Sequence, residues 1–201
     1  MDGLGARPAT SADAEEIVAT LVGAFDADPL WSWAFPDDVK RPAQYEAFFG
    51  LFVESAIPNG WVWITDQAAA VAVWTPPGKS ELSEEAKAKV EPFLTAELGP
   101  HAKPVLQVFE SFESACPEDQ GFYYLSLLGT HPDHRGHGLG MSLLAATLAR
   151  IDAEAMPAYL ESSNPANDAR YERLGFKPRT EFSTPDDEHT VTTMWREPSR
   201  G

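Results

Sequence analysis

The chain has little of three features that would narrow its class: cysteine, basic residues and long apolar segments. Cys116 is the single cysteine among 201 residues, which excludes an intramolecular disulfide framework and a zinc site built from several thiolates. The longest apolar runs, such as residues 68–74, are far shorter than the roughly 20 residues of a membrane helix. Residues 1–5 contain no basic segment followed by an apolar one, as a secretory signal would. We therefore expect a soluble, cytoplasmic protein with no membrane partner.

Basic residues are scarce relative to acidic ones. The chain has 15 Lys and Arg against 31 Asp and Glu, which gives a formal net charge of −16. This excess disfavours nonspecific binding to nucleic acid or anionic lipid, because both are polyanions. The excess is uneven, since residues 131–180 contain six basic and six acidic residues and the rest of the chain holds all of it. We therefore expect no nucleic-acid partner, and an anionic ligand is best tolerated at residues 131–180.

Helical and strand patterns mix along the chain, which predicts one domain of the α/β or α+β class around one sheet. Residues 61–65 and 69–74 predict a hairpin. Residues 82–114 have helical spacing, and Pro92 and Pro104 are each expected to break or begin a helix. The other expected elements are helices after Thr10, after Pro42, from the turn at 135–140 to residue 153 and at 166–174, and strands at 7–9, 122–129, 158–161, 176–182 and 190–195.

The most informative segment is the turn Arg135-Gly136-His137-Gly138-Leu139-Gly140, which joins an apolar strand to an apolar helix. Glycines at alternate positions let the backbone turn tightly and approach a ligand closely. The amides of the first helical turn have no partners within the helix and attract phosphate. The sequence therefore predicts a phosphate-bearing cofactor at residues 135–141.

Three specific ligands, namely a nucleoside triphosphate, a dinucleotide and a metal ion, fit this segment poorly. A nucleoside-triphosphate loop requires a lysine after the last glycine, where this chain has Met141. A dinucleotide fingerprint requires a third glycine at a position that Met141 or Leu143 occupies. His131, His134 and His137 stand three residues apart, but the turn disrupts any regular face and no further His or Cys cluster supports a metal site. We expect no metal.

Two motifs carry a resemblance to a known family. The pattern Arg135-x-x-Gly138-x-Gly140 resembles the signature of the GNAT superfamily of N-acetyltransferases. The run Tyr171-Glu172-Arg173-Leu174-Gly175-Phe176 resembles a second segment of that family. The hairpin at 61–65 and 69–75 is similar to that of the puromycin N-acetyltransferase branch. The resemblance implies the GNAT fold, with a mixed central β-sheet of about six to seven strands flanked by helices.

The resemblance also implies an acetyl-CoA site in the half of the chain from about residue 121 to 201. The residues that would hold acetyl-CoA are Leu128, Gly129, Thr130, Arg135, Gly136, His137, Gly138, Leu139, Gly140, Met141 and Asn167. The amide of Leu128 would bind the thioester carbonyl, and Asn167 the pantetheine or phosphate arm, with Asn164 as the alternative. Tyr171 would contact the cofactor sulfur and protonate the departing thiolate.

The acceptor half, about residues 1–120, is less constrained. Trp31 and Trp33 stand in a short segment bounded by prolines, and Tyr124 and Ser126 on the central strand, so these four are candidate substrate-binding residues. Glu161 ends a predicted strand and is a candidate catalytic base acting through water. The alternative interpretation of Glu161 is a surface carboxylate, since many amines lose their proton to water before they bind.

We expect an acetyl-CoA-dependent N-acetyltransferase that acts on a primary amine of a small molecule. The amine would attack the thioester directly in a ternary complex. Cys116 precedes a proline outside both motifs, so no covalent acyl-cysteine route is expected. Two alternatives remain open, namely a protein or peptide amine acetyltransferase and a non-catalytic sensor that binds acyl-CoA. A homodimer is compatible with the sequence.

Overall fold

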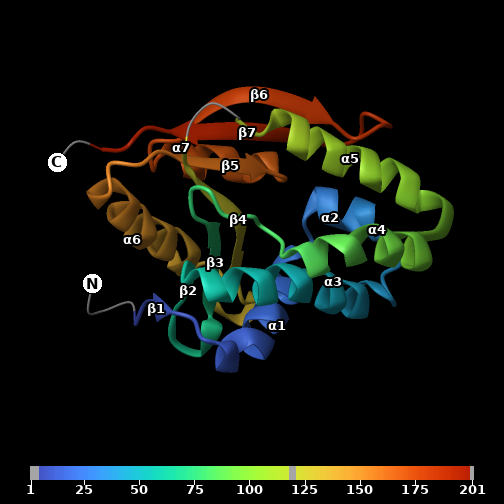
Figure 1. Ribbon diagram of the computed structural model, residues 1–201, viewed down its shortest axis with the longest axis horizontal. Helices are drawn as coiled ribbons and strands as arrows, with labels where there is room; N and C mark the ends of the chain where they lie inside the picture. The colour runs from blue at the N-terminus through green and yellow to red at the C-terminus, as the bar shows by residue number, and fades with distance from the viewer. Residues whose placement is uncertain (1–4, 118–120, 200–201) are drawn as a thin grey trace.

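The computed structural model describes residues 5–117 and 121–199, so residues 1–4, part of the segment used to exclude a secretory signal, lie outside it. Its frame is a seven-stranded sheet with the order β1-β2-β3-β4-β5-β7-β6 (Figure 1). Neighbouring strands are antiparallel except β4 and β5, which are parallel. The strands are β1 (Arg7–Pro8), β2 (Val62–Ile64), β3 (Ala70–Thr75), β4 (Tyr123–Thr130), β5 (Ala158–Ser162), β6 (Lys177–Ser183) and β7 (Thr190–Arg196). This mixed sheet, flanked by helices, confirms the predicted fold class.

Helices cover both faces of the sheet. The α-helices are α1 (Ala14–Phe25), α2 (Pro29–Ala34), α3 (Arg41–Ala56), α4 (Glu84–Leu98), α5 (Ala102–Ala115), α6 (Leu139–Ala153) and α7 (Asp168–Glu172). The first five lie on one side of the sheet and α6 on the other (Figure 1). None of the helices in the described part of the chain has the length and apolar character needed to cross a membrane.

The central strands supply apolar side chains to two cores. Along β3, Val71 and Val73 face the core built with α1 and α3, and Ala72 and Trp74 face the core built with α6. Because both faces are covered, every residue of β3 is buried, and all of them except the last, Thr75, are apolar. The sheet is therefore rigid up to the point where β4 and β5 separate.

Two segments differ from the sequence prediction. Helix α4 continues through Pro92, which we expected to break or begin a helix. Pro92 lies on the exposed side, where water can replace the hydrogen bond that proline cannot donate. Helix α2 was not predicted, although it has an ordinary start with Pro29 at its first position. The Asp28 carboxylate accepts the amides of Leu30 and Trp31 at 3.1 and 3.2 Å, which caps this helix.

Candidate active site

The site begins where the parallel strands β4 and β5 diverge. They pair only over Tyr123–Leu125 and Ala158–Leu160, although β4 continues to Thr130. A cavity of about 870 Å³ lies at this divergence. Its walls come from β4, β5 and α7 on one side and from α2, α3, α4 and α5 on the other.

A β-bulge in β4 shapes the floor of this cavity. Val73 pairs with Leu127 and Trp74 with Leu125, so β4 carries one residue more than β3 between these pairs. The bulge reverses the alternation of the strand, and Leu125 and Leu127 therefore pack into opposite cores. The extra residue, Ser126, lines the cavity.

The backbone of β4 presents a free amide to the divergence. The amide of His131 donates to Ala69 O of the neighbouring chain segment at 2.9 Å. Because hydrogen-bonding direction alternates along an antiparallel pair, the amide of Gly129 also points toward β3 and that of Leu128 points away. Within the described residues no β5 position pairs with Leu128. Its N–H is thus available to a ligand in the cavity that it lines.

The glycine-rich turn precedes helix α6 directly after β4. Gly138, at φ +72°, is the left-handed N-cap residue of α6. The first intrahelical bond runs from the Ser142 amide to Gly138 O at 2.9 Å, so the amides of residues 139–141 have no partner within the helix. A Cβ on Gly140 would lie 2.5 Å from the Thr130 hydroxyl, so only glycine lets the start of the helix approach β4 this closely. These amides lie at the turn where the sequence predicts a phosphate-bearing cofactor.

Arg135 takes a position that the motif alone does not define. Its guanidinium donates to the carbonyls of Gly23 and Ala24 at 2.8 and 3.0 Å, near the C-terminus of α1. The side chain therefore ties the turn to α1 rather than extending over the exposed glycines. His137 is exposed on the same turn. In residues 5–117 and 121–199 no group of three His, Cys, Asp or Glu side chains is placed to hold a metal.

Tyr171 on α7 and Asn167 directly before α7 lie on the same side of the cavity as β4 and β5. Both line it, and the Tyr171 ring packs edge-on against Phe176 with 6.2 Å between centroids. Burial, and then the nearby Asp28 and Asp168 carboxylates, raise the pKa of Tyr171 above its usual value, so its hydroxyl stays protonated at neutral pH. Asn167 Oδ1 accepts from Arg170 at 3.1 Å.

Asn164 has a structural contact. Its Oδ1 atom accepts the amide of Ala166 at 3.1 Å and caps the short turn that leads into α7. Unlike Asn167, it is not among the described residues that line the cavity. The geometry therefore favours Asn167 of the two asparagines as a ligand contact.

Two carboxyl groups face the cavity away from water. Burial raises the pKa of Glu161 to about 7, an effect partly offset by the hydroxyls of Tyr124 and Tyr159 and reinforced by Glu81. Glu161 Oε2 is buried and has no hydrogen-bond partner among the described residues. Burial likewise raises the pKa of Glu81 to about 7, although the Ser126 hydroxyl donates to its carboxylate. Sequence reasoning missed Glu81, because it lies in a polar loop 45 residues before Ser126 and no local pattern marks it.

The predicted acceptor residues divide into two groups. Trp31, Tyr124 and Ser126 line the cavity. Trp33 is not among the described residues that line it. Its ring lies between those of His101 and His189, at 5.1 and 6.4 Å, and its Nε1 donates to Asp186 at 2.7 Å. Trp33 therefore holds the β6–β7 connection against α2 and does not face a substrate in the cavity.

Comparison with known proteins agrees with this geometry. Residues 103–178, from α5 to the start of β6, match the family model described as acetyltransferase (GNAT) domain. This part of the chain is therefore similar to a GNAT acetyltransferase domain. Mycothiol acetyltransferase from Corynebacterium aurimucosum is 33% identical over 81 residues, which cover 39% of this chain and 27% of that protein. The chain thus matches only about a quarter of that curated relative.

Solved structures match the chain over nearly its whole length. A protein from Corynebacterium glutamicum, described as histone acetyltransferase HPA2 and related acetyltransferase, is 26% identical with a TM-score of 0.71, and the match covers 98% of both chains. Arylalkylamine N-acetyltransferase 2 from Aedes aegypti is 13% identical with a TM-score of 0.67 over 98% of this chain and 100% of its own. The second likeness shows a shared fold alone.

Proposed function

We propose that the protein is an acetyl-CoA-dependent N-acetyltransferase acting on the primary amine of a small molecule, by direct attack in a ternary complex. One observation carries the proposal. The divergence of β4 and β5 brings the free amide of Leu128, the hydroxyl of Tyr171 and the buried carboxyl of Glu161 to one cavity. Amide formation needs these three groups: a donor for the carbonyl oxygen, an acid for the departing sulfur and an acceptor for the amine proton.

The residues at the turn fit the cofactor. The amides of residues 139–141 and the open space around Gly138 suit the diphosphate of coenzyme A, and Asn167 suits its pantetheine arm. Acetyl-CoA, when bound, supplies the acetyl group as an activated thioester. Arg135 acts indirectly, since its contacts with α1 hold the turn in place.

The chain's own groups then handle the protons. Because burial raises the pKa of Glu161 to about 7, this carboxyl group is partly ionised near neutral pH. In its ionised form it accepts a proton from the acceptor ammonium. Leu128 N–H donates to the carbonyl oxygen as negative charge develops there. The raised pKa of Tyr171 keeps its hydroxyl protonated, so it can donate a hydrogen bond to the departing thiolate, and the second proton lost by the amine nitrogen completes the free thiol.

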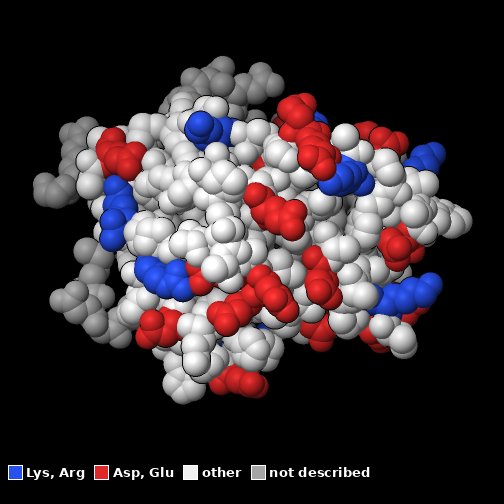
Figure 2. All heavy atoms as spheres, turned by 60° about the horizontal axis from the view of Figure 1, so that its bottom comes forward, with Lys and Arg blue, Asp and Glu red and all other residues white. Residues whose placement is uncertain are grey.

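Charge around the cavity supports a cationic acceptor. Figure 2 shows acidic side chains spread over one face of the molecule, with fewer basic ones between them. The cavity itself follows this trend, since its lining includes six acidic residues and two lysines. The acidic lining residues are Asp28, Glu81, Glu91, Glu110, Glu113 and Glu161. A protonated amine is therefore drawn to the acceptor side.

The walls also favour a small acceptor over a protein. Helices α4 and α5 both contribute to the cavity lining and so cover the side on which a polypeptide would need an open groove. The arylalkylamine N-acetyltransferase with the same fold uses small amines, as its name states, which is consistent with such a pocket. At 13% identity, however, the shared fold does not select the amine.

The proposal is tested with acetyl-CoA and a panel of amines. A ligand that binds only the folded state raises the melting temperature, so acetyl-CoA should do so. Thiol release is then followed with aminonucleosides, polyamines, arylalkylamines, aminoglycosides and amino acids. Release that depends on an amine supports the enzyme. A melting shift with no release from any amine would indicate the acyl-CoA sensor, and no shift at millimolar acetyl-CoA would refute the cofactor assignment.

A further inference from the structure

The acceptor end of the cavity holds a pair of buried carboxyl groups from distant parts of the chain. Glu161 ends β5, and Glu81 comes from the loop between β3 and α4. Both glutamates line the cavity, and the Glu81 carboxylate accepts from Ser126 on β4, the strand that pairs with β5. Burial raises the pKa of each carboxyl group, and the charge of Glu81 raises the pKa of Glu161 further, so one negative charge at this place is favoured over two. A single ammonium group matches such a charge.

Beyond this pair the wall is aromatic. Trp31 from α2, Phe48 and Phe52 from α3, and Phe109 and Phe112 from α5 all line the cavity. Their rings pack on one another, for example Trp31 on Phe48 with centroids 5.5 Å apart and Phe48 on Phe109 at 5.8 Å. Phe48 and Phe52 are 0% and 6% exposed, so they back the wall, whereas the half-buried rings of Trp31, Phe109 and Phe112 form the surface that a ligand would contact. An apolar body placed here would lose its water contact and gain aromatic neighbours.

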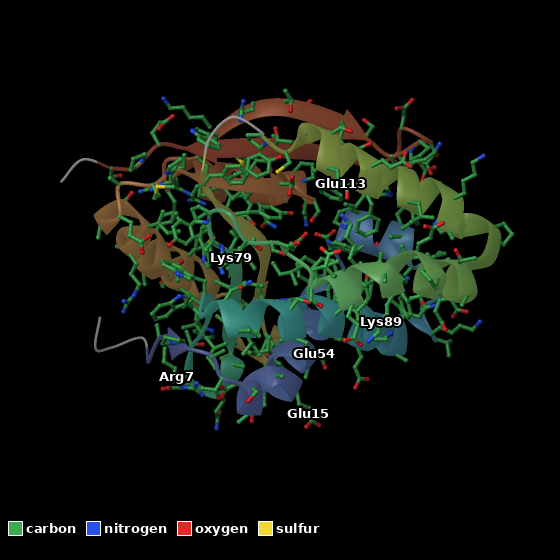
Figure 3. All side chains as sticks on the ribbon, in the orientation of Figure 1. Arg7, Glu15, Glu54, Lys79, Lys89 and Glu113 are labelled. Carbon is green, nitrogen blue, oxygen red and sulfur yellow. The ribbon has the colours of Figure 1, made fainter. Side chains whose placement is uncertain are left out.

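The four remaining acidic lining residues are poorly placed to hold a second cation. The buried Asp28 carboxylate already accepts the amides of Leu30 and Trp31 and the Ser163 hydroxyl. The other three, Glu91 on α4 and Glu110 and Glu113 on α5, are exposed, so solvent and salt screen their charges. Figure 3 shows Glu113 on α5 and Lys79 on the loop after β3, and both residues line the cavity. Lys79 and Lys87 offset part of the negative charge at this outer part. A second ammonium would therefore gain little there, whereas an apolar group gains the aromatic wall.

Accepting the proposed acetyltransferase function, we infer that the acceptor is a primary monoamine with an aromatic or similarly large apolar body. Its nitrogen is held by the Glu81–Glu161 pair, and its body lies against the wall formed by Trp31, Phe48, Phe52, Phe109 and Phe112. Glu81 is thus a specificity residue for the amine.

The first test compares two amines of defined chemistry, 2-phenylethylamine and 1,4-diaminobutane, with acetyl-CoA at saturation. Burial of the phenyl ring should raise kcat/KM for 2-phenylethylamine over that for 1,4-diaminobutane by roughly 10- to 100-fold. Equal or better use of the diamine would overturn the inference and leave the proposed function standing. Calorimetric titration of both amines into the protein with coenzyme A tests the same preference without turnover. Preferred binding of 2-phenylethylamine without acetyl transfer would support the inference and refute the proposed function, and no binding of either amine would overturn the inference.

Matched variants locate the two parts of the site. Glu81→Gln should raise KM for 2-phenylethylamine about tenfold, as expected for loss of a charged hydrogen-bonding partner. Glu46→Gln, which changes an exposed glutamate of α3 outside the described lining of the cavity, should leave KM within about twofold. Because the Glu81 charge raises the pKa of Glu161, the acid limb of the kcat/KM profile should move to lower pH in Glu81→Gln. An unchanged KM and an unmoved limb in a folded Glu81→Gln protein would remove Glu81 from the site.

The aromatic wall has its own control. Phe112 lines the cavity. Phe182 on β6 packs against the Phe112 ring, with 5.1 Å between the centroids, but is not among the described residues that line the cavity. Phe112→Ala should lower kcat/KM for 2-phenylethylamine by about tenfold and affect 1,4-diaminobutane far less. Phe182→Ala should lower the melting temperature without changing the ratio between the two amines. An equal loss for both amines in Phe112→Ala would contradict the placement of the apolar body.

Discussion

Gly138 offers a sharp test of the cofactor assignment, because the chain contains a matched control. Gly138 has φ +72° at the start of α6, and Gly60 has φ +74° at the turn before β2. A Cβ at either position meets no atom within 4 Å. Valine at either site therefore suffers the same left-handed backbone strain, with no added clash inside the protein. The two variants differ only in what binds beside them.

The expected magnitudes follow from strain and linkage. Holding valine in the left-handed region costs about 1–3 kcal/mol in either variant. For a chain of this size, each kcal/mol lowers the melting temperature by about 2–4 °C. Acetyl-CoA at 100 times its dissociation constant stabilises the folded state by about 2.7 kcal/mol, which corresponds to a rise of roughly 5–11 °C. Gly60→Val should keep that rise, and Gly138→Val should lose it because the side chain fills the phosphate cradle.

The assay is thermal unfolding of the three proteins with and without acetyl-CoA, followed by circular dichroism. Similar melting temperatures for the two variants without ligand would show that the strain is matched. A full ligand-induced rise in Gly138→Val would refute the idea that the turn binds the cofactor phosphates. Loss of the rise in Gly60→Val would show that backbone strain alone abolishes binding.

Three further substitutions test individual groups. Tyr171→Phe should lower kcat by about 10²-fold and leave the acetyl-CoA dissociation constant within about threefold, and unchanged turnover would remove Tyr171 from the acid role. Glu161→Gln should lower the plateau that wild-type kcat/KM reaches above pH 7. Because the folded chain holds the Glu161 proton more tightly than its ordinary pKa of 4.5 implies, wild type should lose stability as pH rises from 4.5 to about 7, and the Gln variant should lose less over that range. Arg135→Ala should lower the free energy of unfolding in urea by about 1 kcal/mol through loss of its bonds to α1, whereas a tenfold loss of acetyl-CoA affinity at unchanged stability would place Arg135 on the phosphates instead.

Local patterns predicted most of the fold. The hairpin of β2 and β3, the strand–turn–helix unit from β4 to α6 and the last two strands all follow from apolar periodicity and glycine positions. The prediction that Pro92 breaks or begins a helix was wrong, because proline breaks a helix only where its missing hydrogen bond and its ring cannot be accommodated. Helix α2 was overlooked because six residues are too few to establish a periodic pattern, although its cap at Asp28 was readable.

The candidate site divides in a similar way. Residues of the turn and of α7 were accessible from spacing, since their neighbours in space are neighbours in sequence. Glu81 and Ser126 meet only because the loop after β3 folds over a bulge in β4, which no short window of sequence contains. Trp33 illustrates the opposite case, because an aromatic residue in the right segment can still point to the wrong side of a short helix.

The bulge at Ser126 separates the packing of β4 from its contribution to the candidate site. After the bulge, Leu127 and Gly129 face α1, and Leu128 and Thr130 face α6. A Cβ on Gly129 would lie 3.0 and 3.1 Å from Ala24 and Leu21, so α1 leaves room for glycine alone at this position. Deleting Ser126 would restore simple alternation without changing any face, because Leu125 already pairs with Trp74 and Leu127 with Val73 on opposite sides of the sheet. The packing of β4 against α1 and the direction of the Leu128 amide should therefore survive the deletion, whereas the Ser126 hydroxyl that donates to Glu81 at the cavity would be lost. The bulge thus adds one polar residue to the candidate site while the residues of β4 that pack into the two cores stay the same.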